Sequence, residues 1–363
     1  MARAKCQKPS VELYKIPTAT PESDGTLAWD STQLVLVQVQ AGSETGLGYT
    51  YADEACARLI AGELASLIEG REAMDIPGAW AAMRRAIRNL GRPGICSMAI
   101  AAVDLALWDL KAKLLELPLV RLLGGCRPSI PIYGSGGFTS YSLAELERQL
   151  GEWAAAGIGA VKMKVGRDPA QDVERVRVAR AAIGPECGLY VDANGAYSRQ
   201  QALRLAYQFA NYGVSWFEEP VPSDDLEGLR WLRQRLPPGM DVAAGEYGYD
   251  LPYFRHMLTA EAVDVQQADI TRCAGLSEFA RVEGLCAAFQ TDLSAHTAPS
   301  LHCHPCCALE RCRNIEYFFD HARIEQMLFE GAPEPRQGAL WPDLSRPGWG
   351  LELKPRMARK YAA

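Results

Sequence analysis

Three acidic residues close three successive strand-like runs of this chain at nearly equal intervals. Asp192, Glu218 and Glu246 each follow directly on a short apolar run, and they are separated by 26 and 28 residues. One strand, one helix and two short loops occupy about that length. Parallel strands joined by crossover helices point in the same direction, so their carboxyl ends lie on one side of the sheet. The spacing therefore predicts three carboxylates side by side at the mouth of a parallel barrel.

The same interval recurs on both sides of this triad. Lys164 precedes the triad by 28 residues, and Asp269, His296 and Glu316 follow it at successive intervals of 23, 27 and 20. Seven consecutive predicted strand ends thus carry an ionisable side chain. Ionisable residues are rarely buried without a partner, so packing alone does not account for the pattern. Converging carboxylates repel one another unless they share a proton or hold a hard cation.

The length of 363 residues and the charge bound the class of protein. A barrel of eight strand–helix units takes about 250 residues, which leaves roughly a hundred for a second unit. The net charge of −6 argues against a nucleic-acid surface. No uninterrupted apolar run predicts a membrane span, and Met1–Ser10 lacks the apolar core of a secretory signal. We expect a cytoplasmic protein with a small anionic substrate and without nucleic-acid or membrane partners. We also expect a homo-oligomer.

The eleven cysteines show no regular spacing. In the absence of a secretory signal, they are predicted to be reduced thiols in the core. The run His-Cys-His-Pro-Cys-Cys at 302–307 has the residue types of a zinc site but lacks paired C-x2-C motifs. It also falls where the alternation of strands and helices predicts a helix, directly after the strand that ends at His296. A helix-packing role for His302 and His304 is therefore favoured over metal binding.

The chain divides into a first part without a regular alternation of strands and helices and a second part that has this alternation. Residues 1–125 are predicted to form an α+β capping domain, with strands at 34–39 and 46–51. Helical periodicity follows over 54–69, 79–89 and 97–117.

Residues 126–319 are predicted to form the barrel domain, beginning with a strand at 130–133. Strand-like runs there alternate with helical stretches, which predicts an α/β fold of the (β/α)8 type. These helical stretches lie at about 141–155, 169–183, 198–211, 225–235, 251–259, 273–289 and 299–309. The Pro- and Gly-rich tail, 320–363, is predicted to return to the capping domain and complete it.

At this point the motifs resemble those of a known family, the mandelate racemase-like subgroup of the enolase superfamily. The resemblance covers nearly the whole chain, and the ordered set is specific although each piece alone is weak. Its motifs are Val161-Lys162-Met163-Lys164, Val191-Asp192-Ala193-Asn194-Gly195, Trp216-Phe217-Glu218-Glu219-Pro220, Gly245-Glu246, Asp269, Ser294-Ala295-His296 and Ile315-Glu316-Tyr317. A junction between domains is similar as well, at 101–110 followed by 122–125.

The resemblance implies roles for these residues. It implies a Mg²⁺ ion held by Asp192, Glu218 and Glu246. It implies that Lys164 is a base on one face of the substrate and that the His296–Asp269 pair acts on the other face. It further implies that Glu316 hydrogen-bonds a substrate carboxylate oxygen.

The sequence departs from the family pattern near the sixth barrel strand. Thr271-Arg272-Cys273 occupies the region where the muconate-lactonizing subgroup carries a second catalytic lysine, so that subgroup is disfavoured. Ala268 and Ala274-Gly275 replace the family's usual Pro and Gly-Gly. These changes affect loop geometry and the shape of the pocket, and they remove no chemical group.

The expected reaction begins with abstraction of the proton α to a carboxylate, which needs a cation to offset the charge that develops. Dehydration of an acid sugar (an aldonate or aldarate) to a 2-keto-3-deoxy acid is the preferred interpretation. Racemisation or epimerisation of a 2-hydroxy acid by the same Lys and His bases is the alternative. A metal-binding barrel without turnover is a third interpretation.

Other polar residues have two interpretations each. Lys162 is expected to bind substrate, with screening of the carboxylates as the alternative. Asn194 contacts the substrate or shapes its turn. Strand alternation directs Glu219 away from Glu218. His256 and His321 are expected at the surface. The polar segment 20–32, which includes Trp29 and Asp30, is expected to be a mobile loop that closes over the barrel mouth.

Overall fold

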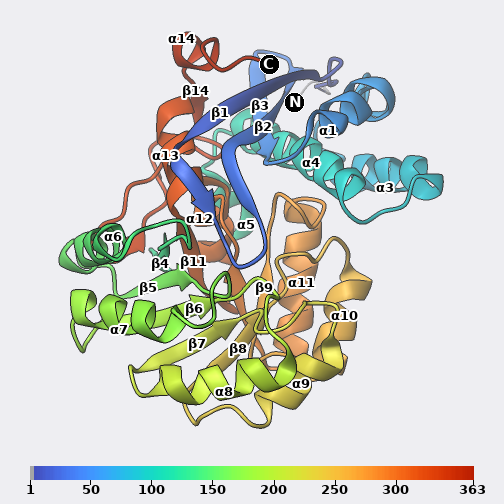
Figure 1. Ribbon diagram of the computed structural model, residues 1–363. Coiled ribbons are helices and arrows are strands. Elements are labelled where there is room, and N and C mark those ends of the chain that lie inside the picture. Colours follow the sequence, from blue (N-terminus) through green and yellow to red (C-terminus); the bar gives the residue numbers. More distant parts are fainter. Residues whose placement is uncertain (1–3) are drawn as a thin grey trace.

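A closed barrel of eight parallel strands forms the body of the molecule (Figure 1). The computed structural model describes residues 4–363. Consecutive strands pair in order, and the last, β11, pairs with the first, β4, to close the ring. The barrel strands are β4 (Ile130–Gly136), β5 (Ala160–Lys164), β6 (Gly188–Asp192), β7 (Val214–Glu218), β8 (Asp241–Ala244), β9 (Val265–Ala268), β10 (Asp292–Ala295) and β11 (Cys312–Phe318). The predicted fold class is therefore confirmed in its barrel.

Helices connect these strands on the outside of the ring (Figure 1). They are α6 (Leu143–Ala155), α7 (Asp172–Ile183), α8 (Arg199–Ala210), α9 (Leu226–Arg233), α10 (Leu251–Thr259), α11 (Leu276–Ala288), α12 (Pro299–Ala308) and α13 (Phe319–Leu328). Several begin at a side-chain cap: Ser142 and Glu145 form a reciprocal capping box at α6, and Ser198 and Asp250 cap α8 and α10. The sequence predicted the helices of the seven stretches between 141 and 309.

An antiparallel sheet of three strands caps the barrel. Its strands are β1 (Ser10–Ser23), β2 (Ala28–Ala41) and β3 (Glu44–Thr50), in that order. The helices that follow the sheet in the chain are α1 (Glu54–Leu59), α2 (Ala65–Ile68), α3 (Ile76–Ala86), α4 (Ile95–Leu114) and α5 (Leu119–Leu123), with a π-helical segment at Ile60–Leu64 and a 3₁₀ turn at Ile87–Asn89. Of these helices, α4 packs against β2 and β3, and α1 contacts β1 and β2. The N-terminal antiparallel cap that the sequence predicted is therefore present.

The polar segment 20–32 differs from expectation. It is the end of a long hairpin, because β1 runs to Ser23 and β2 begins at Ala28. Figure 1 shows this hairpin, in dark blue, reaching from the cap toward the barrel. Thr139, just past β4, donates its backbone N–H to the Ser23 carbonyl at 2.8 Å. Most of the segment is therefore strand where a loop was expected, and it lies next to the barrel as expected. Its mobility and its closure over the barrel mouth stay predictions.

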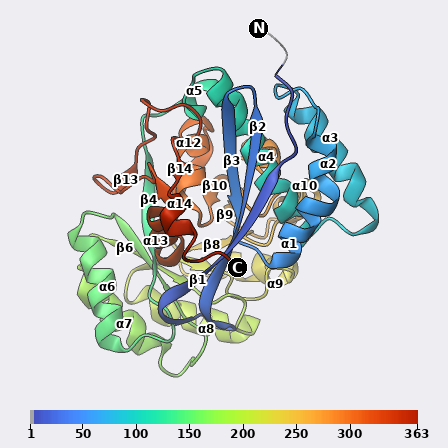
Figure 2. The same ribbon diagram turned by 90° about the horizontal axis from the view of Figure 1, so that it is seen from above.

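The tail contacts the cap through main-chain pairing. The Lys15 N–H donates to the Tyr361 carbonyl at 2.8 Å, and the Ala363 N–H donates to the Leu13 carbonyl at 3.0 Å. In Figure 2 the C-terminal end lies beside β1. The tail's short elements are β12 (Phe329–Glu330), β13 (Ala339–Leu340), β14 (Glu352–Leu353) and α14 (Pro355–Ala358). The domain division at residues 125 and 320 stays a prediction.

Side chains inside the barrel form an apolar lower layer and a charged upper layer. The lower layer is a buried cluster of Tyr133, Ala160, Tyr190, Trp216, Ala243 and Val265. Successive side chains on a strand alternate between the inside and the outside. Residues two positions further along therefore also point inward, which places Lys162, Asp192 and Glu218 inside the barrel and nearer its carboxyl end.

All eleven cysteines are free thiols, and ten of them are buried. His302 and His304 are also buried, on α12. His302 Nε2 accepts from the Ile270 N–H at 3.0 Å, and His304 Nδ1 accepts from the Val120 N–H at 3.2 Å. The helix-packing interpretation of the 302–307 run is confirmed. Over residues 4–363, no helix has the length and apolarity needed to cross a membrane.

Candidate active site

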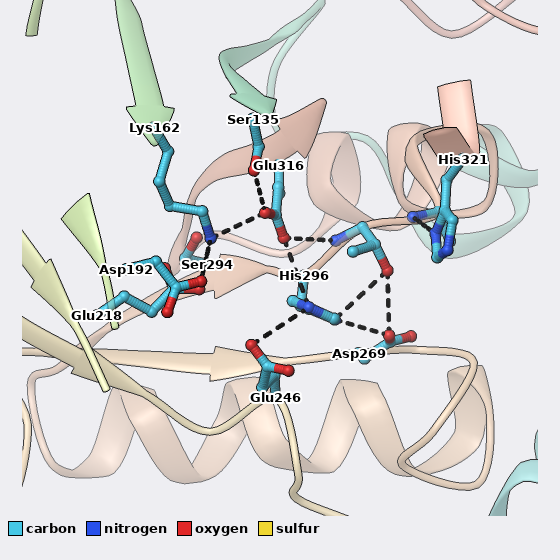
Figure 3. Close-up of polar contacts among 12 residues, drawn as sticks. Ser135, Lys162, Asp192, Glu218, Glu246, Asp269, Ser294, His296, Glu316 and His321 are labelled. Atoms are coloured by element: carbon cyan, nitrogen blue, oxygen red, sulfur yellow. Dashed lines mark hydrogen bonds and ion pairs between the residues drawn. The ribbon is translucent and has the colours of Figure 1, made fainter. Parts of the chain in front are cut away.

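Three buried carboxylates converge at the carboxyl end of the barrel. Asp192 and Glu218 end β6 and β7, and Glu246 follows β8. Each offers an oxygen within 4.8 Å of the other two, and their exposed fractions are 0, 0 and 3%. Burial and the neighbouring Asp192 carboxylate raise the pKa of Glu218 well above its usual range. Figure 3 shows Asp192 and Glu218 together, with Glu246 on a separate strand end.

This triad fits a hard divalent cation. Within the described chain, Glu246 Oε2 is buried and accepts no hydrogen bond. An unpaired buried carboxylate oxygen is costly, and a carboxylate triad that shares an ion removes both this cost and the mutual repulsion. Oxygen-only donor sets of this kind suit Mg²⁺ or Ca²⁺.

Two lysines of β5, Lys162 and Lys164, contact carboxylates of the triad. Lys162 Nζ contacts Glu218 directly and lies 3.5 Å from Asp192 Oδ2 and 2.8 Å from Glu316 Oε1. Its side chain is 1% exposed, and Lys162 is not among the residues that line the pocket. This position favours the screening interpretation over direct substrate binding.

Lys164 does line the pocket, and its Nζ lies 2.5 Å from Asp192 Oδ2. Burial lowers the pKa of Lys164, but the Asp192 carboxylate outweighs burial and raises it. The like charge of Lys162 also lowers the pKa of Lys164, but together with burial it does not outweigh Asp192. A cation at the triad acts in the opposite direction to Asp192, because it carries the same sign of charge as the ammonium group.

His296 and Asp269 form a hydrogen-bonded pair past β10 and β9. His296 Nδ1 lies 2.9 Å from Asp269 Oδ2. Burial raises the pKa of Asp269, but the hydrogen bond and charge of His296 outweigh burial and hold it well below its usual range. An ionised Asp269 accepts, so Nδ1 is the protonated nitrogen. His296 Nε2 is therefore left to face Glu246 Oε2 at 3.4 Å and Glu316 Oε2 at 3.6 Å.

Glu316 lies on β11 among three donors. It accepts from the Ser135 hydroxyl at 2.6 Å and from the Thr297 N–H at 3.1 Å, beside Lys162. Burial raises the pKa of Glu316, but the charges of Lys162 and His296 outweigh burial and hold it well below its usual range. An ionised carboxylate is an acceptor only. The hydrogen bond expected from Glu316 to a substrate carboxylate oxygen would need a proton that this environment disfavours, whereas a substrate hydroxyl suits the ionised form.

A pocket of about 470 Å³ opens over these groups between barrel and cap. The barrel contributes Lys164, Asn194, Glu246, Arg272, His296, Thr297, Glu316 and His321, and the cap contributes residues that include Asp24, Leu27, Trp29 and Tyr51. Both interpretations of Asn194, substrate contact and turn shaping, fit its position. It lines the pocket and has a left-handed backbone with φ 47°. Glu219 lines a separate hollow beside Tyr247 and Tyr253.

One histidine lies elsewhere than predicted, and several pocket residues were not predicted. His256 is exposed as expected, but His321 is 8% exposed and lines the pocket. The ring of Tyr51, far away in the sequence, covers His321. Ser135 could have been found from strand alternation, because it lies two residues beyond the inward-facing Tyr133. No sequence signal marks Tyr51 as a pocket residue, whereas Arg272 lies in the region where a related subgroup carries a catalytic lysine, and that signal could have placed it in the pocket.

Comparisons with known proteins agree with this geometry. Residues 13–124 match the family model "Mandelate racemase / muconate lactonizing enzyme, N-terminal domain", and residues 145–357 match "Enolase C-terminal domain-like". The chain belongs to the mandelate racemase/muconate lactonizing enzyme family of the enolase superfamily, as the motifs implied.

Two curated relatives act on acid sugars by name. L-talarate/galactarate dehydratase of Salmonella typhimurium is 31% identical over 361 residues, covering 96% of this chain and 89% of the relative. The 3,6-anhydro-α-L-galactonate cycloisomerase of Streptomyces coelicolor is 34% identical over 301 residues, covering 81% and 82%.

Two solved structures share the fold over almost the whole chain. A mandelate racemase/muconate lactonizing enzyme-like protein from Rubrobacter xylanophilus has a TM-score of 0.97 and 53% identity, with 99% of this chain and 100% of that chain covered. A racemase from Streptomyces coelicolor, solved with bound magnesium, has a TM-score of 0.92 and 30% identity, with the same coverage.

Proposed function

We propose that this chain is a Mg²⁺-dependent acid-sugar dehydratase, which removes water from an aldonate or aldarate to give a 2-keto-3-deoxy acid. One observation carries the proposal: a single pocket brings a lysine and a carboxylate-paired histidine to the edge of a three-carboxylate cation site. The likeness to L-talarate/galactarate dehydratase over 96% of the chain supports the same substrate class.

Asp192, Glu218 and Glu246 are the residues that hold Mg²⁺. Their buried oxygens converge, and the similar Streptomyces racemase was solved with magnesium. When bound, the ion supplies positive charge that offsets the negative charge developing on the substrate as the α proton leaves.

Lys164 and His296 flank the cation site on different strands. In the ring order, the triad occupies the ends of β6 to β8, with Lys164 on β5 to one side and Asp269 and His296 past β9 and β10 to the other. Lys164, as the free amine, accepts the proton from the carbon next to the substrate carboxylate. This arrangement supports a base on each side of a bound substrate.

His296 completes the elimination. Its protonated Nε2 donates to the departing β-hydroxyl, so that the C–O bond breaks and water leaves. Asp269, which accepts the Nδ1 proton, stabilises the imidazolium form that makes this donation. The enol product takes a proton at C3 and loses the proton of its C2 hydroxyl, which gives the 2-keto-3-deoxy acid. Glu316 accepts a hydrogen bond from a substrate hydroxyl, and Asn194 contributes to the pocket wall.

Racemisation or epimerisation of a 2-hydroxy acid is the second candidate, because bases on two sides of one carbon can remove and return a proton from opposite faces.

Incubation of the protein with Mg²⁺ and a panel of aldonates and aldarates decides between these reactions. A semicarbazide-reactive keto acid supports dehydration. A C2 epimer without a keto acid supports racemisation. Bound Mg²⁺ with neither product from any acid sugar contradicts the proposal and favours a non-catalytic barrel.

A further inference from the structure

His321 is a buried pocket residue that the proposed chemistry does not use. It lies on α13, which begins directly after the strand that carries Glu316. The side chain lines the same pocket as Lys164 and His296 and is only 8% exposed. Figure 3 shows the ring beside the Glu316 and His296 cluster.

Aromatic neighbours hold the ring in one orientation. The ring of Tyr51 stacks on it, with centroids 3.4 Å apart and an interplanar angle of 12°. Phe318 approaches its edge at 5.1 Å and 85°. The Tyr51 hydroxyl is itself held by Glu325 Oε1 at 3.3 Å. The imidazole is thus preorganised between cap and barrel before any ligand binds.

A strained turn fixes which ring nitrogen carries the proton. His321 Nδ1 accepts from the Ala298 N–H at 3.4 Å. Ala298 and Thr297 both have left-handed backbones, with φ 39° and 49°, and His302 Nδ1 donates to the Thr297 carbonyl at 2.9 Å. Consecutive non-glycine residues in this region are strained. The turn directs one N–H to Glu316 and the next to His321.

The acceptor role of Nδ1 leaves Nε2 as the donor of a neutral ring. Burial lowers the pKa of His321 to about 3, which agrees with a neutral imidazole near pH 7. No group of residues 4–363 hydrogen-bonds to Nε2. Nε2 is not among the fully buried polar atoms that lack a partner, so it is accessible from the pocket that His321 lines, and an oxygen that enters the pocket can accept from it.

We propose that His321 donates a hydrogen bond from Nε2 to an oxygen on the substrate chain beyond C3, and thereby selects polyhydroxylated acids over short or apolar 2-hydroxy acids. The inference rests on the proposed function, because it takes the ligand to be an acid sugar. A site built to bind a hydroxyl rejects the analogue that lacks it, since the protein donor is then left unpaired. His321 is thus a specificity-determining residue and takes no part in proton transfer at C2.

Two variants separate the two ring nitrogens. His321→Gln places an amide N–H near the position of Nε2, whereas His321→Asn places an amide oxygen near Nδ1 and has no donor that reaches the position of Nε2. The readout compares an accepted acid sugar with glycerate, which has no carbon beyond C3. It is the ratio of kcat/KM for the acid sugar to kcat/KM for glycerate. Where glycerate is not turned over, its C2 exchange rate in D₂O takes the place of its kcat/KM. His321→Asn is expected to lower this ratio at least about tenfold. His321→Gln is expected to retain most of it, and the exposed His256→Asn serves as the matched control.

The outcomes are distinguishable. An equal loss for both substrates in His321→Asn, or no loss for either, overturns the inference while the proposed function stands. Retention of the ratio by His321→Asn but not by His321→Gln also overturns it. If the wild-type protein binds Mg²⁺ but neither binds nor turns over any acid sugar, the proposed function fails first, and the inference fails with it. Unchanged Mg²⁺ affinity and circular dichroism in each variant show that the fold is intact.

Discussion

His296 Nε2 lies 3.4 Å from Glu246 Oε2, so a ligand of the proposed cation site touches the imidazole of the His–Asp pair. Asp269 holds the other ring nitrogen at 2.9 Å. The acid–base group and the cation site therefore share one wall of the pocket. Removal of either Glu246 or Asp269 is expected to affect the chemistry in a different and separable way.

Glu246→Gln is expected to weaken Mg²⁺ binding. The amide keeps the volume but removes the negative charge of one of three ligands, so affinity is expected to fall at least about tenfold, or about 1.4 kcal/mol. Titration calorimetry with Mg²⁺ measures this directly. Glu227→Gln, an exposed change on α9, is the matched control. Wild-type affinity in Glu246→Gln would remove Glu246 from the ligand set.

Asp269→Asn is expected to lower kcat by about 10²- to 10⁴-fold, the usual contribution of a general acid–base group. The amide can donate to Nδ1, which stabilises the wrong tautomer and moves the proton to Nε2. Mg²⁺ affinity is expected to stay within about twofold, because Asp269 is not a proposed ligand. Steady-state kinetics and calorimetry on the same preparation test both parts. A kcat near that of the wild type would show that the pair is structural.

Gly25→Ala is expected to raise KM several-fold without loss of Mg²⁺ binding. A Cβ at Gly25, at the tip of the β1–β2 hairpin, would lie 2.5 Å from the Ala193 carbonyl oxygen and 2.7 Å from that of Val165. The hairpin must then shift away from the barrel mouth. Gly62→Ala is the control, since a Cβ there meets nothing within 4 Å. An unchanged KM would mean that the hairpin tip does not shape the pocket.

Asp104 makes stability depend on pH at the junction of cap and barrel. It accepts from the Ser277 N–H at 2.9 Å and from the Ser277 hydroxyl at 2.6 Å. Burial raises the pKa of Asp104 from 3.8 to about 7, so the folded state binds more protons than the unfolded state between these values. Stability from this group is present below about pH 4 and is lost as pH rises toward 7.

Asp104→Asn is expected to remove that dependence. The difference in unfolding free energy between the wild-type protein and the variant is expected to change by up to about 4 kcal/mol between pH 4 and pH 8, in favour of the variant at high pH. Urea unfolding at several pH values measures it, with the exposed Asp30→Asn as the control. Parallel pH profiles for wild type and Asp104→Asn would contradict the assignment.

The barrel and its charged rim could be predicted because they depend on local periodicity. Each inward-facing residue at a strand end, such as Asp192 or Glu218, occurs at a regular interval in the sequence. β1 was not predicted, because Pro17 and Pro21 interrupt its alternation. The structure accommodates them with a register shift between Pro17 and Glu22.

The upper half of the pocket could not be predicted for a different reason. His321 is buried by Tyr51, which lies 270 positions earlier in the chain, and its nitrogen is oriented by a left-handed turn at Ala298. No local pattern encodes either contact. The position of Lys162 beneath the carboxylates likewise depends on the side chains of several strands.

Exchange of the C2 proton of an acid sugar in D₂O, followed by proton NMR, tests the central claim most directly. In the presence of Mg²⁺ the wild-type protein should exchange this proton. Lys164→Ala should abolish exchange for substrates of one C2 configuration while Mg²⁺ affinity is retained. Exchange of both configurations at wild-type rates in Lys164→Ala, or no exchange by the magnesium-bound wild-type protein, would contradict the account.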